Sequence, residues 1–359
     1  MKLIDKYMMK QFLLTLLFSI LVLCVIFIIV NLIERMDKFI DSKMSIAQIA
    51  HYYVVFLPDI LKMLIPVAVL ISSLFTVGKM SNINEITAMK SGGYSLYRIM
   101  LPFIIICTFI SFGQLYFNGW LVPKANEKKF LMEQKFLNVN DNNTLSNFYY
   151  RENPTTNITI GYYEPNYQVA FNTSVEYFTP EPNPRLIKKI SARSMEWDST
   201  KKIWRMNDII VRNFDSNTVN NTRLDKMEIK LSADGEQMRK IQKKSDQMTF
   251  PETREYLYFL KNGGKDITKL ETEYYANYAF PFANLIVIFF SIPFASVKKK
   301  NGLAMQIAAA MGVAFTYLVF WKVGQSIGAG LSLNPVLSGW FANIIFIIIG
   351  IIILLKTKT

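Results

Sequence analysis

The sequence predicts a helical membrane protein with six transmembrane helices and a β-rich domain inserted between the third and the fourth helix. Two observations support this fold class. Long uncharged apolar runs occur near both ends of the chain, and the sequence between residues 122 and 277 changes to short segments in which apolar and polar residues alternate. The chain has 359 residues, of which 51% are hydrophobic, so it is long enough for a membrane domain and one further domain.

The first span, residues 12–30, carries no charge, and its length matches a hydrocarbon layer about 30 Å thick. It is longer than the core of a signal peptide, and residues 31–35 offer no small-residue cleavage site. We therefore expect it to remain in the protein. Five further spans are expected, at residues 53–78, 99–121, 278–297, 303–327 and 335–355.

Basic residues in the short segments between spans predict the orientation. They gather near both termini, in residues 79–98 and in residues 298–300, whereas the segments 34–52 and 328–334 carry no positive excess. Both termini are therefore expected in the cytoplasm and the inserted domain outside. Basic and acidic residues are nearly balanced in residues 122–277, so most of the net charge of +13 follows from topology and predicts no nucleic-acid partner.

The inserted domain is expected to be a β-sandwich or an open barrel. Residues 158–162 and 227–231 alternate most clearly, and residues 190–197 and 203–211 have the spacing of a hairpin. A helix is expected at residues 251–261, before the fourth span. Such a domain fits sensing or scaffolding outside the membrane, or the binding of an amphipathic ligand, and the alternation does not separate these functions.

A short amphipathic helix is expected at residues 82–92, between the second and third spans. Asn82 and Glu85 have the spacing of a capping box, and the pair Gly92 and Gly93 supplies a stop. A partner could bury the apolar face of this helix and meet the Glu85 carboxylate at its edge. The alternative is an ordinary turn between membrane helices. The apolar face comprises Ile83, Ile86 and Met89.

Charged residues within or next to the spans are candidate sites because an unpaired charge in a bilayer costs several kcal/mol. Asp59 and Lys62 lie in the second span, where they could also pair with each other, and Lys322 lies in the fifth. Arg35 and Lys38 follow the first span. Cations arranged in this way suit an anionic head group, such as that of a phosphorylated lipid.

Several catalytic motifs are absent from the sequence. No P-loop occurs, and the Gly264 and Lys265 pair lacks the remaining residues of that motif, so we expect no ATP hydrolysis by this chain. His51 is the single histidine, and Cys24 and Cys107 lie inside apolar spans, so neither a metal centre nor a disulfide framework is expected. A secondary transporter is disfavoured because the spans contain no carboxylate relay.

The order of three spans, a β-rich domain and three spans, with the segment 84–93 in the first cytoplasmic loop, resembles the LptF/LptG permease family. This family forms the membrane part of the lipopolysaccharide-export ABC transporter. The resemblance covers essentially the whole chain, and within the family the sequence is most similar to the LptG subunit. Its sharpest pieces are residues 3–7, Pro58 with Pro66, residues 85–92, Val122 with Pro123, and residues 197–198 with 203–206.

The resemblance implies a domain division at 1–121, 122–272 and 273–359, with the middle part a periplasmic β-jellyroll. The short helix would be a coupling helix in a groove of an LptB-like ATPase dimer, which would use ATP and Mg while this chain binds no cofactor. An LptF-like permease and an LptC-like single-span protein would complete the assembly in the inner membrane of a Gram-negative bacterium. The implied coupling residues are Ile83, Glu85, Ile86, Met89, Ser91 and Gly92.

The resemblance also implies extraction of lipopolysaccharide from the outer leaflet into a cavity gated by the first and fifth spans. A lysine that meets the lipid phosphate in some LptG subunits is replaced here by Asn31, so either Arg35 substitutes or the contact moves to Lys62 and Lys322. The competing hypothesis is an envelope-sensing or scaffold protein with no transport role. The candidate phosphate ligands are Arg35, Lys38, Lys62, Lys322, Lys124, Lys128 and Lys129.

Overall fold

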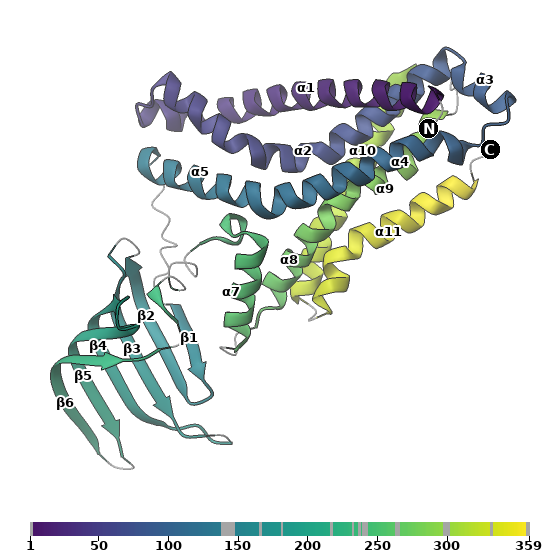
Figure 1. Cartoon of the computed structure of the whole chain (residues 1–359). Helices are drawn as coiled ribbons and strands as arrows, with labels where there is room; N and C mark the ends of the chain where they lie inside the picture. Colours follow the sequence, from purple (N-terminus) through teal and green to yellow (C-terminus); the bar gives the residue numbers. More distant parts are fainter. Residues whose placement is uncertain are drawn as a thin grey trace. The chain divides into compact units, whose positions relative to one another are not determined.

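The protein divides into two compact units, and each is described separately (Figure 1). The helical unit comprises Met1–Leu137 and Thr268–Thr359, and the β unit comprises Asn138–Ile267. The computed structural model describes residues 3–137, 148–164, 167–180, 182–215, 218–231, 233–235, 238, 243–262, 266–296, 302–330 and 333–356.

The predicted spans of the helical unit are helices, which confirms the predicted fold class. Five helical stretches among the described residues are long and apolar enough to cross a membrane, and the predicted fifth span, 303–327, lies in α10. The elements are α1 (Leu3–Asp41), α2 (Ile46–Asn82), α3 (Glu85–Ser91), α4 (Leu96–Tyr116), η1 (Phe117–Leu121), α5 (Val122–Phe136), α8 (Thr268–Ala279), η3 (Phe280–Phe282), α9 (Ala283–Ser296), α10 (Gly302–Gly330) and α11 (Pro335–Lys356).

Helices α1 and α2 form a long antiparallel hairpin that extends beyond the apolar runs at both ends. Ser45 caps α2 through a capping box: its hydroxyl accepts from the amide of Gln48, and its own amide donates to the Gln48 side chain. The N-terminus and α3 lie at one end of the unit, and the α1–α2 turn lies at the other (Figure 1). We call these the α3 end and the hairpin end.

Small residues allow the C-terminal helices to pack closely. A Cβ atom on Gly339 of α11 would lie 2.7 Å from the backbone nitrogen of Ala276 in α8, and one on Gly328 of α10 would lie 2.6 Å from the Cβ of Ser338. Such close approach of backbones is typical of helices that associate within a membrane. The Asn343 amide strengthens this contact by donating to the carbonyl of Ala279 at 2.7 Å.

The third predicted span does not end at Leu121. The chain passes from α4 through the π-helical turn η1 directly into α5, and Pro123 is accommodated in the first turn of α5. Helix α5 packs against α2 and belongs to the helical unit. The units therefore separate at residue 137 rather than at 122, because apolarity ends with the bilayer-length run while the helix continues.

The six described strands form one antiparallel sheet in which neighbours follow chain order. They are β1 (Phe148–Asn153), β2 (Thr156–Glu164), β3 (Val169–Phe178), β4 (Leu186–Asp198), β5 (Ile203–Phe214) and β6 (Val219–Ile229), and α7 (Phe250–Asn262) follows them. The hairpin predicted at residues 190–211 is present as β4 and β5, and the helix predicted at 251–261 is α7. The described strands form a meander, not the crossed connections that the term jellyroll implies.

The turn between β4 and β5 is organised by Asp198. Its carboxylate accepts hydrogen bonds from the hydroxyl and the amide of Thr200 and from the amide of Lys201, and it pairs with Arg205. The Thr200 hydroxyl, followed by the Lys201 amide, holds the pKa of the Asp198 carboxyl below its ordinary value. This turn fixes the register in which Trp197 and Trp204 lie opposite each other.

The core of the β unit surrounds Trp204, which is completely buried. The Trp204 ring lies 5.2 Å from that of Trp197 and 6.3 Å from that of Tyr163, between ring centres. Its indole nitrogen donates to the carbonyl of Ala233 at 2.8 Å, and the Tyr163 hydroxyl donates to the carbonyl of Gly235 at 2.8 Å. Residues 233–235 are thereby held over the sheet.

Candidate functional site

The predicted docking helix exists as α3, but its ends differ from the prediction. Asn82 does not cap it, because α2 continues to Asn82 and α3 begins after Asn84, which has a left-handed backbone with φ of 64°. The helix ends as predicted at the glycine pair, where Gly93 has φ of 82°. The amides of Gly93 and Tyr94 donate to the carbonyls of Lys90 and Met89, which is the Schellman pattern.

The apolar face of α3 is turned into the protein itself. Ile86 is 1% exposed and belongs to the same core as Met8 and Phe12 of α1, and Met89 is half-buried against that core. Ile83, which precedes the helix, is 56% exposed. The interpretation that Ile83, Ile86 and Met89 form one stripe for a partner is therefore corrected.

The solvent face of α3 consists of small side chains, namely Thr87, Ala88 and Ser91, followed by the exposed Gly92. The Ser91 hydroxyl donates to the carbonyl of Thr87 at 2.8 Å, so it stays close to the helix. We call Thr87, Ala88 and Ser91 the outward face. Because it carries no bulky group, another protein could approach the helix closely there.

Two polar contacts join the α3 end of α1 to the segment that contains α3. The Tyr7 hydroxyl donates to the Glu85 carboxylate, with oxygen separations of 3.4 and 3.5 Å. The second contact is an ion pair, in which a guanidinium nitrogen of Arg98, in the first turn of α4, lies 2.7 Å from Oδ2 of Asp5. Ile86 lies between these contacts in sequence and anchors the helix.

At the hairpin end, Arg35 is held by other residues of the protein. Its guanidinium lies 2.8 Å from Oε1 of Glu133 in α5 and donates to the Tyr52 hydroxyl of α2 at 2.9 Å. The Tyr52 hydroxyl also donates to Glu133 at 2.8 Å. Arg35 thus joins three helices, and a lipid phosphate would have to compete with Glu133 for it.

The remaining candidate cations differ in their availability. Lys62 donates to Oδ1 of Asn277 at 3.2 Å, and the ammonium group of Lys129 lies 3.8 Å from the centre of the Phe56 ring. The ammonium group of Lys322 lies 5.1 Å from the centre of the Trp321 ring, and it contacts Gln325 at 3.3 Å. The exposed candidates are Lys38, Lys124, Lys128 and Lys322.

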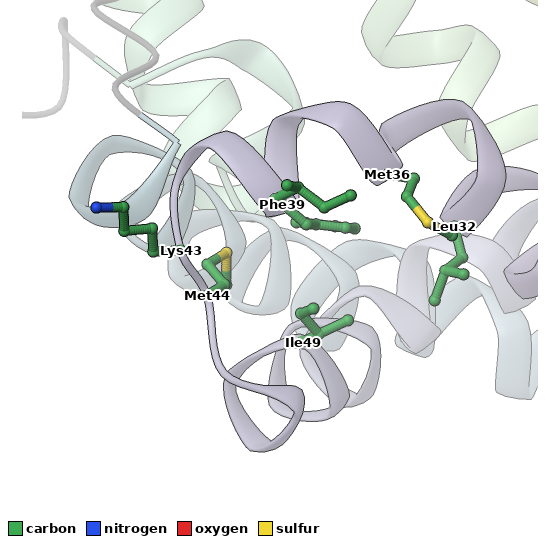
Figure 2. A pocket seen from close by; sticks show the side chains of 7 residues that line it. Leu32, Met36, Phe39, Lys43, Met44 and Ile49 are labelled. Carbon is green, nitrogen blue, oxygen red and sulfur yellow. The ribbon is translucent and has the colours of Figure 1, made fainter.

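A pocket of about 300 Å³ lies at the hairpin end and was not expected from the sequence (Figure 2). Its wall is apolar, and Figure 2 shows the ammonium group of Lys43 pointing away from the apolar side chains. The spacing of Leu32, Met36 and Phe39 could have indicated this face, but it lies beyond the uncharged run. The lining residues are Leu32, Met36, Phe39, Ile40, Lys43, Met44 and Ile49.

Comparison with known families agrees with this architecture. The model of the lipopolysaccharide export system permease LptF/LptG family matches residues 6–356, which is nearly the whole chain. The chain belongs to the LptF/LptG family. A comparison with curated proteins finds no match.

Membership defines the general role of this LptF/LptG permease. It is a multi-pass membrane permease in lipopolysaccharide export, it is a transport component rather than an enzyme, and it works together with other Lpt proteins. The family model joins LptF and LptG, so it does not separate the two subunits.

Proposed function

We propose that this permease is a non-catalytic, LptG-like subunit that couples ATP hydrolysis in a separate LptB-like ATPase to extraction of lipopolysaccharide. The observation that carries the proposal is α3, whose apolar face is anchored by Ile86 while its outward face presents small side chains. A helix with its apolar side already buried is a rigid platform, and such preorganisation reduces the entropic cost of docking. The sequence offers no P-loop, so an ATPase must be supplied by a partner.

The docking contact would consist of the outward face of α3 and the groove of an LptB-like ATPase dimer, where ATP and Mg are used. Glu85 is half-buried beside Tyr7, and its carboxylate lies at the edge of the outward face. It would meet a basic or hydrogen-bonding group of the ATPase. This arrangement requires the α3 end and both termini to be cytoplasmic, as the distribution of basic residues predicts.

The hairpin end would then meet lipopolysaccharide from the outer leaflet. Lys38 lies on α1 in the same hairpin as the apolar pocket, Lys124 and Lys128 lie on α5, and Lys322 lies on α10. Exposed ammonium groups suit the phosphates of the lipid, and apolar helix surfaces suit its acyl chains. Arg35 is a weaker candidate because Glu133 already neutralises it.

An LptF-like permease and an LptC-like single-span protein would complete the assembly. Apolar side chains of α1 are exposed along most of its length, and 17% of its most apolar stretch is buried inside the protein. Such a surface is satisfied by lipid or by another transmembrane helix. The inserted β unit would lie in the periplasm of a Gram-negative bacterium.

Co-purification tests the proposal. The permease is expressed with its Lpt partners and purified by a tag on this chain, and we expect an LptB-like ATPase and phosphorylated lipid to be retained. Glu85→Ala is expected to weaken ATPase retention, because the carboxylate at the edge of the docking face is lost. Absence of the ATPase from the wild-type preparation, with no effect of Glu85→Ala, contradicts the proposal.

Lys322 provides a test of the lipid contact. We expect Lys322→Glu to reduce lipid binding or export more strongly than Lys322→Arg, because arginine preserves the positive charge while glutamate repels a phosphate. Binding of purified lipopolysaccharide to the two variants in detergent gives the comparison. Equal binding by Lys322→Glu and Lys322→Arg rules out a phosphate contact at this position.

A further inference from the structure

The α3 end of α1 holds a partly buried ion pair whose position is not explained by the needs of the individual helices. The Asp5 side chain is 4% exposed, and its Oδ2 lies 2.7 Å from a guanidinium nitrogen of Arg98. An acidic residue in the first turn of a helix interacts favourably with the helix dipole, but this interaction does not require the side chain to be buried. Burial adds a desolvation cost that only a partner can offset.

Arg98 is placed even less favourably with respect to its own helix. It lies in the first turn of α4, directly after the cap formed by Ser95, where the positive end of the helix dipole disfavours a cation. The contact with Asp5 compensates for that position. The pair therefore joins two helices at a cost to each, which indicates a requirement for the link between them.

The ion pair connects α1 to the segment that carries α3. Along the chain, α3 reaches α1 only through the whole of α2 and the turn at the hairpin end, whereas it is joined to α4 by the short linker Gly92–Ser95. In space, α1 contacts α3 through Tyr7 and Glu85, and it contacts the first turn of α4 through Asp5 and Arg98. Ile86 of α3 also shares a core with Met8 of α1. A displacement of α3 would therefore act directly on α1.

We propose that Asp5 and Arg98 are positioning residues that make α1 follow the docking helix during the ATPase cycle. This inference rests on the proposed function, because it takes α3 as the docking element. Helix α1 is anchored at its other end by Arg35 and Glu133, and its middle is largely exposed. A push at α3 that is passed on to α4 through the short linker would reach α1 through the ion pair and would tilt or shift α1 as a unit.

The experiment measures lipid released per ATP hydrolysed. The full permease with its Lpt partners is reconstituted in proteoliposomes, with purified lipopolysaccharide as the probe. We expect Asp5→Asn and Arg98→Gln to retain the ATPase and hydrolyse ATP while the ratio falls by roughly 5- to 150-fold, the usual range of coupling between sites. The exchange of charges in Asp5→Arg with Arg98→Asp is expected to restore most of the ratio.

A matched control is the ion pair between Lys189 and Glu176 in the β unit, which also has a separation of 2.7 Å. Glu176→Gln is expected to leave the ratio unchanged. The inference is overturned if the Asp5 and Arg98 single variants keep the wild-type ratio, or if the charge exchange performs no better than the single variants. Failure of wild-type protein to retain an ATPase overturns the proposed function instead, so the two failures are distinguishable.

A distance measurement provides a second readout if a single variant gives too little protein for transport assays. Spin labels are placed at Lys10 of α1 and at Tyr97 of α4, both of which are exposed. With the ion pair intact, we expect one narrow distance distribution with and without ATP. In Asp5→Asn the distribution is expected to broaden when ATP is added, and an unchanged narrow distribution in that variant contradicts the inference.

Discussion

Ala88→Trp is expected to abolish retention of the ATPase by this permease. Ala88 lies in the middle of the outward face of α3, where small side chains allow close approach of a partner. An indole ring in a closely packed contact cannot be accommodated without separating the two surfaces. We expect a loss of at least about 2 kcal/mol, or roughly 30-fold in affinity, measured by titrating purified ATPase onto immobilised permease.

Ala47→Trp is the matched control for this substitution. Ala47 is also exposed, but it lies in the first turn of α2 at the hairpin end of the same unit. The same gain of volume there is expected to leave ATPase affinity within twofold of wild type. Equal affinities of Ala88→Trp and wild type would show that the outward face of α3 is not the docking surface.

Trp204→Ala is expected to destabilise the β unit by about 3–5 kcal/mol, the usual cost of removing a large buried aromatic side chain. The ring is completely buried between Trp197 and Tyr163, and its loss also leaves the carbonyl of Ala233 without its hydrogen-bond donor. Residues 233–235 would lose one of their attachments to the sheet. Thermal unfolding of the full permease, followed by limited proteolysis within the β unit, measures the effect.

Two further variants separate the contributions of this side chain. Trp204→Phe keeps an aromatic ring but removes the indole donor, so we expect a smaller loss, of about 1–3 kcal/mol. Tyr167→Ala, at a residue that is 79% exposed, is expected to change stability by less than about 0.5 kcal/mol. If Trp204→Ala unfolds no more readily than Tyr167→Ala, the assignment of Trp204 as the centre of this core is wrong.

The membrane helices and the inserted β domain could be predicted because their signals are local. A bilayer requires an apolar run of fixed length, and a half-buried strand requires alternation, so residues 12–30 and 158–162 identify their elements directly. The ends of the helices were less predictable. Apolarity marks only the part of α4 to α5 that matches the bilayer, and the π-helical turn at η1 lets the helix continue past Pro123.

Helix α3 shows why the faces of a helix are harder to predict than the helix itself. The spacing correctly places Ile86 on an apolar face, but the partner for that face is the core around Met8 and Phe12, more than seventy residues away in the chain. The Asn82 capping box failed because α2 continues through Asn82 and α3 begins only at Glu85. Of the three residues of that apolar stripe, the structure buries Ile86 and leaves Ile83 exposed.

The candidate cations illustrate the same limit. Arg35 was a candidate because charge near an apolar span needs compensation, and the compensating group, Glu133, comes from α5 through a tertiary contact. Lys62 and Lys129 are likewise engaged by Asn277 and Phe56. No sequence pattern pairs residues that far apart, so only the folded chain shows which cations remain exposed to a ligand.

Reconstitution tests the central claim most directly, namely that this chain couples ATP hydrolysis in a partner to movement of lipopolysaccharide. Proteoliposomes that contain purified lipopolysaccharide and the remaining Lpt subunits are prepared with and without this chain, and lipid transfer to an acceptor is measured with and without ATP. We expect transfer only when both the chain and ATP are present. Equal ATP-dependent transfer in its absence contradicts the account.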